Sequence, residues 1–329
     1  MFRVAKRLVG CLACVLCTQS GAAYACDALR DACFDRDARW RSVAASKVVG
    51  QTDPRGLADS YAVGIDVQYV ARPLRLQLPS PTPFETTTTS VVSAALDTEL
   101  LVGYQLRSLL AEAALGATLW QSGGGLKAVS GGSGLPDMAL RDARIAAQWT
   151  AVGAARESRF SFAPRIVLSI PTGTKQTFRT EGSWGAATSV LASARFADWH
   201  VDAEAGLRAR PRAEHGAFGV DTAVQAVMQL GVSRSMERAH ALTLSTAVFA
   251  APALLGQRSL RQQTDGSLVG APLHATWMPA EWSVGAQACE SVHCNWRLMP
   301  EFAVALPLGS QVLNVAAAWR ASLGIRWTL

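Results

Sequence analysis

The sequence predicts an all-β protein: a transmembrane antiparallel up-and-down β-barrel of about 12 strands, with 14 as the alternative. Three observations predict it: an N-terminal leader, a series of alternating apolar and polar segments, and connections of unequal length between them. Hydrophobic residues make up 50% of the 329 positions and charged residues only 17%, below the roughly one quarter of soluble domains. After the leader, no apolar run approaches the ~20 residues of a spanning helix. Membrane strands produce this combination, because their apolar residues alternate with polar ones.

Residues 1–25 are the predicted signal peptide. Arg3, Lys6 and Arg7 precede an apolar run that ends at Cys17, and Ala23–Ala25 supplies a cleavage site of the A-x-A type. The mature chain would carry 28 basic and 25 acidic residues, a net charge of +3, which is too weak to indicate a nucleic-acid partner. Lipidation of Cys26 is the alternative processing, although the usual leucine three residues before the cysteine is absent.

Four of the seven cysteines remain in the mature chain, as two close pairs: Cys26 with Cys33, and Cys289 with Cys294. An exported chain with an even number of cysteines is expected to form disulfides. Four cysteines allow three connectivities, and spacing alone favours the two local ones. These four cysteines form no Cys-x-x-Cys pair, and the five histidines share no ligand spacing, so we expect no metal site and no cofactor.

Residues 26–57 are polar, without a clear period, and predict a periplasmic N-terminal segment. The barrel is predicted over residues 58–329, where runs of mostly 10–15 residues alternate apolar and polar side chains. Residues 199–209 are the clearest case. A membrane strand needs about 9–11 residues, whereas soluble strands average 5–6. Tryptophans near the ends of these runs predict aromatic girdles at the membrane interfaces: Trp120, Trp149, Trp184, Trp199, Trp277, Trp282 and Trp327.

The connections alternate between long and short. The long ones are 79–90, 121–137, 171–183 and 252–270, and the short ones are 107–108, 197–198 and 278–281. Long loops on one side and short turns on the other are typical of outer-membrane barrels. With the N-terminus in the periplasm, the long loops would face outward, and the Cys289–Cys294 segment is expected among them. Residues 297–318 make the strand count uncertain, because Pro300, Pro307 and Gly309 interrupt them.

Several short motifs resemble a known family. They are Tyr69–Leu74, Leu119–Gly123, Leu140–Ala146 and Ser169–Gly173. Over residues 58–329 the sequence resembles the barrel half of OmpA-family proteins of Gram-negative bacteria and, more distantly, phenol-degradation transporter-like barrels. The resemblance implies an outer-membrane location, with outer-membrane lipid and the barrel-assembly machinery as partners. The family often adds a peptidoglycan-binding domain after the barrel, but this sequence ends at the last strand, so we do not expect cell-wall anchoring.

The candidate site is a network of polar side chains on the inner face of the barrel. Burying charges is expensive unless they are paired, so facing arginines and carboxylates would cross-link the lumen. Two interpretations stay open: an interior salt-bridge lattice that fills a closed barrel, or a hydrophilic conduit, for which 12 strands leave room. The predicted members are Asp142, Arg144, Arg159, Arg165, Arg195, His200, Asp202, Glu204, Arg208, Asp221 and Gln225.

Three functions follow from this prediction. The first is a pore or transporter for small solutes, and the second is a structural or surface-binding barrel with a filled lumen. The third is an outer-membrane lipid hydrolase, for which His200 would have to act with Ser189 or Ser193. No catalytic motif supports the third, and the glycine-rich stretch 123–134 lacks the Lys-Ser/Thr ending of a phosphate loop, so we do not expect an enzyme. The oligomeric state stays open.

Overall fold

The computed structural model describes residues 59–79, 86–106, 108–124, 134–149, 151, 160–173, 184–196, 199–209, 224–236, 242–255, 258–262, 268–272, 280–288, 296–306 and 319–328. The three predicted-site residues Arg159, Asp221 and the side chain of Arg195 lie outside this description, as do all four cysteines of the mature chain. Within the described residues, no helix is long and apolar enough to cross a membrane.

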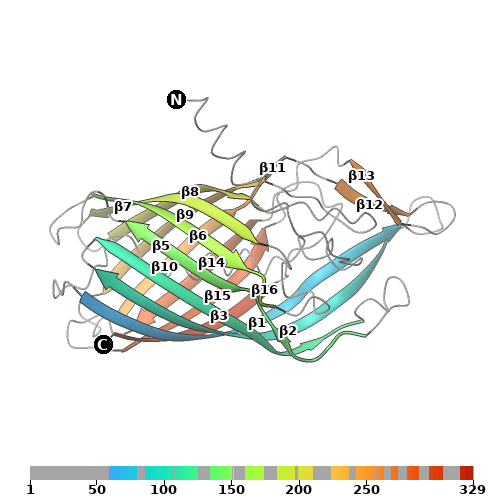
Figure 1. Cartoon of the computed structure of the whole chain (residues 1–329), viewed down its shortest axis with the longest axis horizontal. Helices are drawn as coiled ribbons and strands as arrows, with labels where there is room; N and C mark the ends of the chain where they lie inside the picture. Colours follow the sequence, from blue (N-terminus) through green and yellow to red (C-terminus); the bar gives the residue numbers. More distant parts are fainter. Residues whose placement is uncertain are drawn as a thin grey trace.

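Twelve antiparallel strands close into a barrel (Figure 1), as predicted from the sequence. Each strand pairs with the next along the chain, and β1 pairs with β16 from Ala62 opposite Thr328 to Ala71 opposite Trp319. Closure removes the open edges that lipid cannot satisfy. In order, the barrel strands are β1 (Asp59–Pro79), β2 (Thr86–Leu106), β3 (Leu109–Ser122), β5 (Ala143–Trp149), β6 (Phe160–Ile170), β7 (Gly185–Phe196), β8 (Trp199–Ala209), β9 (Val224–Met236), β10 (Leu242–Ala250), β14 (Ala280–Ala288), β15 (Trp296–Leu306) and β16 (Trp319–Thr328).

Four shorter strands lie outside this circuit. β4 (Ala139–Leu140) pairs with β3, β11 (Ala253–Leu255) pairs with β9, and β12 (Arg258–Gln262) pairs with β13 (Leu268–Pro272). We call the end of the barrel where β2 meets β3 and β7 meets β8 the turn end, and the opposite end the loop end. β1 and β2 stay paired past the barrel, up to Pro79 opposite Thr86, and form a hairpin beyond the loop end (Figure 1).

The outer and inner faces of the barrel differ in polarity because successive side chains of a strand point to opposite faces. On β8, for example, Leu207 is exposed on the outside while Arg208 is buried inside. An apolar outside and a polar inside are what a lipid environment requires of a spanning barrel.

Aromatic side chains gather near both ends of the outer surface. At the turn end Tyr61 packs on Tyr104 at 4.7 Å and Phe160 on Phe196 at 6.3 Å between ring centroids. At the loop end Trp319 stacks between Tyr69 and Phe302. Tyr61 and Tyr69 are eight residues apart on β1, which at ~3.3 Å per residue and a tilt of ~40° corresponds to about 20 Å along the barrel axis. This height is close to the ~25 Å apolar band of outer-membrane barrels.

Two of the expected connections are partly strand. In the range 79–90, Pro79 still belongs to β1 and residues 86–90 belong to β2. In the range 278–281, Ala280 and Glu281 already belong to β14, and residues 278–279 lie outside the description. The strand β15 runs through Pro300, which lies opposite Leu323 on an exposed position where the missing N–H costs one ladder hydrogen bond at most.

Cys289 and Cys294 lie outside the described residues, so their expected position among the long loops stays a prediction.

Candidate functional site: the barrel lumen

Three buried arginine–carboxylate pairs line the wall formed by β2 to β6. Arg141 Nη1 lies 2.9 Å from Asp97 Oδ2, Arg144 binds Glu99, and Arg165 Nη2 lies 3.7 Å from Glu112 Oε2. Thr118 donates a further hydrogen bond to Asp97, at 2.7 Å. Because an unpaired buried charge is strongly disfavoured, this pairing holds the long side chains against the wall in fixed positions.

A second group of pairs lines the wall from β14 to β1. Arg320 on β16 lies between two carboxylates: its Nη2 is 3.0 Å from Glu281 Oε1, and it also binds Glu301. Arg326 Nη2 lies 3.4 Å from Asp66 Oδ2. The last pair crosses the seam between the first and last strands, so an ionic contact joins the two ends of the chain where the barrel closes.

A β-bulge between β4 and β5 directs two neighbouring charges into the lumen. Regular alternation would send either Arg141 or Asp142 into the membrane, yet both are buried, at 1% and 6% exposure. From Leu140 to Arg144 the chain takes one residue more than the facing segment of β3, from Ala117 to Ala114. Such an extra residue re-aims the side chains that follow it.

The segment after β6 satisfies the backbone groups that the bulge releases. Thr172 Oγ1 accepts a hydrogen bond from Ala143 N–H at 2.8 Å and donates one to the Arg141 carbonyl at 3.1 Å. Gly173 N–H donates to Asp142 Oδ1 at 3.2 Å. Two of the motifs that carry the family resemblance, around residues 140–146 and 169–173, therefore meet in space and form one joint.

The loop-end half of the lumen is tightly packed. The largest fully buried side chains of the described residues all lie there: Gln121, Arg141, Arg208, Gln225, Phe249 and Glu281, which we call the constriction layer. Arg208 Nε donates to Gln225 Oε1 at 3.0 Å, so part of this layer is itself hydrogen bonded. A solute crossing the barrel would have to pass these six side chains.

The turn-end half is more open. Ser245 shares the inner face of β10 with the buried Thr243 and Phe249, yet Ser245 itself is exposed. On β8 the inward His200, Asp202 and Glu204 are half-buried. Small residues recur on the inner face from β7 to β14, namely Ser193, Gly206, Gly231, Ser233, Ser245, Ala247, Ser283 and Gly285. Ser245 is the exposed member of this set, whereas Ser233 and Ser283 are buried.

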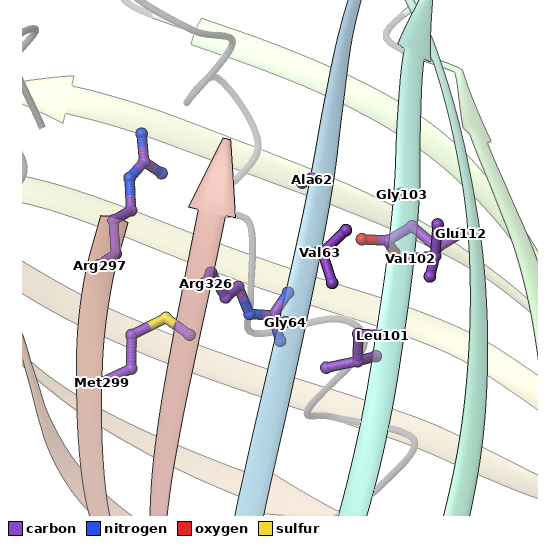
Figure 2. Close-up of a pocket in the computed structure, with 10 residues that line it drawn as sticks. All are labelled: Ala62, Val63, Gly64, Leu101, Val102, Gly103, Glu112, Arg297, Met299 and Arg326. Atoms are coloured by element: carbon purple, nitrogen blue, oxygen red, sulfur yellow. The ribbon is translucent and has the colours of Figure 1, made fainter. Parts of the chain in front are cut away.

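A small cavity of about 30 Å³ lies in the turn-end half, where β15, β16, β1, β2 and β3 meet (Figure 2). It is lined by charged residues (Arg297, Arg326 and Glu112) and by the apolar side chains of Met299 and Leu101. Such a volume holds about two water molecules. Figure 2 shows Arg326 reaching from β16 over Gly64 on β1, and a Cβ at Gly64 would lie only 3.0 Å from Arg326 Cγ.

The structure places the described members of the predicted network as follows. Asp142, Arg144, Arg165, Arg208 and Gln225 are buried on the inner face, and His200, Asp202 and Glu204 are half-buried there. The prediction omitted nine further inner charges that form ion pairs. The nine are Asp66, Asp97, Glu99, Glu112, Arg141, Glu281, Glu301, Arg320 and Arg326.

Of the residues considered for hydrolysis, Ser193 is a diagonal neighbour of His200 on the inner face, because Ser193 is opposite Asp202 and His200 is opposite Arg195. Ser189 lies farther along β7, opposite Gly206. The hydroxyl of Ser193 is 2.6 Å from that of Ser161. In the described part of the chain, His, Cys, Asp and Glu form no group of three or more that could hold a metal ion.

Comparison with solved structures identifies the fold. An outer-membrane channel from Pseudomonas putida F1 superposes with a TM-score of 0.56 at 14% identity, over 83% of this chain and 96% of that one. The NanC porin gives a TM-score of 0.45 at 9% identity, over 80% of this chain and 100% of that one. The β domain of the Bordetella autotransporter BrkA gives 0.43 at 13%, over 83% and 100%.

This chain therefore has the fold of outer-membrane β-barrels. Of these three structures, the Pseudomonas channel has a TM-score above 0.5, and at 14% identity its likeness concerns the fold alone. No family model and no curated protein matches the sequence. None of the three structures is described as an OmpA-family protein, so that resemblance remains an expectation.

Proposed function

We propose that this chain is an outer-membrane channel that passes small polar solutes through its lumen. One observation carries the proposal: inside a closed barrel with an apolar outer surface, Ser245 is exposed and the neighbouring polar side chains of β8 are only half-buried. Twelve strands enclose more space than the eight that side chains alone can fill. The exposed Ser245 is where that extra space borders the wall of the lumen.

The outer surface supports the membrane location. Aromatic side chains at the two ends of the barrel bound an apolar band about 20 Å high, and exposed leucine, valine and isoleucine side chains occupy the space between them. In water such a surface would drive aggregation. A lipid bilayer is the environment that this surface fits.

The constriction layer favours a second candidate, a structural barrel with a filled lumen. Phe249, Gln225 and Glu281 are completely buried, so side chains occupy the loop-end half. The two candidates differ in one measurable property, because a channel conducts ions across a planar bilayer and a filled barrel does not.

The test uses two neighbouring substitutions on β10. Ser245→Trp adds an indole to the inner face and is expected to reduce single-channel conductance at least several-fold, since a large ring then occupies the narrow open side. Leu244→Trp adds the same ring to the outer face, where Leu244 is already 42% exposed, and should leave conductance unchanged. If the wild-type barrel folds but shows no single-channel conductance, the filled-lumen candidate is favoured. If the two substitutions reduce conductance equally, the ions do not pass beside Ser245.

A further inference from the structure

The outer surface of the barrel carries an arginine at the turn end, in a position that faces lipid. Among the described side chains of the barrel strands, Arg234 on β9 is the one charged residue that is exposed. The residue directly opposite it on β10, Leu244, is an exposed outer leucine. An arginine on the lipid-facing side is strongly disfavoured at the bilayer midplane and tolerated near the interface. The place of Arg234 along the barrel axis therefore decides what it contacts.

Arg234 continues a row of aromatic side chains that crosses four strands. Its Cζ lies 5.3 Å from the ring centroid of Trp199, the first residue of β8. Trp199 is opposite Phe196 on β7, and Phe196 packs edge-on against Phe160 of β6 at 6.3 Å. All three rings are exposed on the outer surface. The guanidinium thus lies in the aromatic girdle, at the level where such girdles meet lipid head groups.

The described residues supply no anion for this guanidinium. The salt bridges of the described part of the chain all use arginines of the inner face, and Arg234 is in none of them. Its apolar stem lies along the outer wall, so the charged end can extend toward water. Stacking on Trp199 orients the planar group, and an oriented group loses little conformational freedom when it binds a ligand.

We infer that Arg234 and Trp199 bind the phosphate of a glycerophospholipid at the turn-end interface of the membrane. The parallel N–H donors of a guanidinium match two oxygens of a phosphate. Phe160 and Phe196 extend the site with apolar surface for the glycerol and upper acyl groups, and Leu244 contacts the acyl chain. A soluble phosphate would leave this apolar surface uncovered, so the structure favours the lipid. Because short turns of outer-membrane barrels face the periplasm, the lipid belongs to the periplasmic leaflet.

The test is native mass spectrometry of the folded barrel released from dodecyl maltoside micelles. The probe is dioleoylphosphatidylglycerol, and dioleoylglycerol, which has the same acyl chains and no phosphate, is its control. Wild-type protein should bind the first phospholipid at least about tenfold more tightly than the diacylglycerol, because charge-assisted hydrogen bonds contribute a factor of this size. Arg234→Gln should weaken phospholipid binding by about tenfold and leave diacylglycerol binding unchanged.

Arg297→Gln is the matched control, since it removes the same charge from a residue that lines the lumen cavity, and it should leave phospholipid binding unchanged. Trp199→Leu keeps the charge and removes the stacking ring, so phospholipid binding should weaken about threefold; this variant keeps the test decisive if Arg234→Gln does not fold.

Three results would overturn the inference. The first is equal binding of the two lipids by the wild type, and the second is an equal effect of Arg234→Gln and Arg297→Gln. The third is displacement of the phospholipid by an equal concentration of inorganic phosphate, because the site would then recognise soluble phosphate and the lipid assignment would be wrong. None of these measurements depends on current through the lumen, so the lipid site and the proposed channel stand or fall separately.

Discussion

Gly206 on β8 is the position where the barrel wall should tolerate a side chain least. A Cβ there would lie 2.6 Å from Ser189 Cβ and 2.8 Å from Ser189 Cα, and closer still to the Thr188 carbonyl oxygen. Two of these three atoms are backbone atoms, so no rotamer change relieves the contact, and β7 and β8 must move apart by at least about 0.4 Å to bring Ser189 Cβ to 3.0 Å. Overpacking of this kind costs about 1–3 kcal/mol. Gly206→Ala should therefore lower the free energy of unfolding by that amount.

Gly231 on the neighbouring strand β9 provides the matched control. A Cβ at Gly231 would lie 3.6 Å from both Ala247 Cβ and the Thr246 carbonyl oxygen, which is ordinary van der Waals contact. Gly231→Ala should leave stability within about 0.5 kcal/mol of wild type. Urea unfolding in detergent, followed by the gel shift between folded and unfolded barrel, compares the two; a loss of ~2 kcal/mol corresponds to a midpoint about 1 M lower. Equal midpoints for the two variants would refute the steric reasoning.

Three further changes test the lumen. Thr172→Val removes the side-chain partner of the Ala143 N–H and the Arg141 carbonyl and should cost about 0.5–1.5 kcal/mol by urea unfolding, whereas Thr172→Ser should cost clearly less. Glu281→Gln removes a completely buried carboxylate from Arg320 and should destabilise by about 3 kcal/mol; a smaller loss than for the more exposed Glu301→Gln would contradict the burial argument. Phe249→Ala removes a fully buried ring from the constriction layer and should raise single-channel conductance, and unchanged current would show that this layer does not limit passage.

The fold could be predicted because alternation is a local property. The run at 199–209 coincides with β8 (Trp199–Ala209). Prediction was hardest at β15, since Pro300 carries the sequence signal of a break. In the barrel a proline removes one N–H from one ladder, and the remaining pairs of β15 with β14 and β16 keep the strand in place.

The site could be predicted only in part. Predicting an ion pair requires the pairing register of the strands as well as the face on which each residue lies. Alternation places Arg144 inside, but its partner Glu99 is 45 residues away, and only the pairing through β3 brings them together. Glu281 was missed because its surroundings read as a turn. Arg141 was missed because strict alternation would place it opposite Asp142, and no local signal in the sequence marks the bulge that turns both inward.

The two walls of the lumen carry different kinds of side chain, which explains how one barrel can be both rigid and open. On the β2–β6 wall, three ion pairs fix long arginines against the strands. The hydrogen bond from Thr172 to the Arg141 carbonyl holds the bulge that directs one of these arginines, Arg141, into the lumen. The wall from β7 to β14 carries serine, glycine or alanine at many inner positions, and among these small residues Ser245 is exposed, so open space borders these strands. A passage here is bounded by ion-paired side chains on one side and by small side chains on the other. Substitutions among the small residues should therefore change its width while the ion pairs of the opposite wall stay untouched.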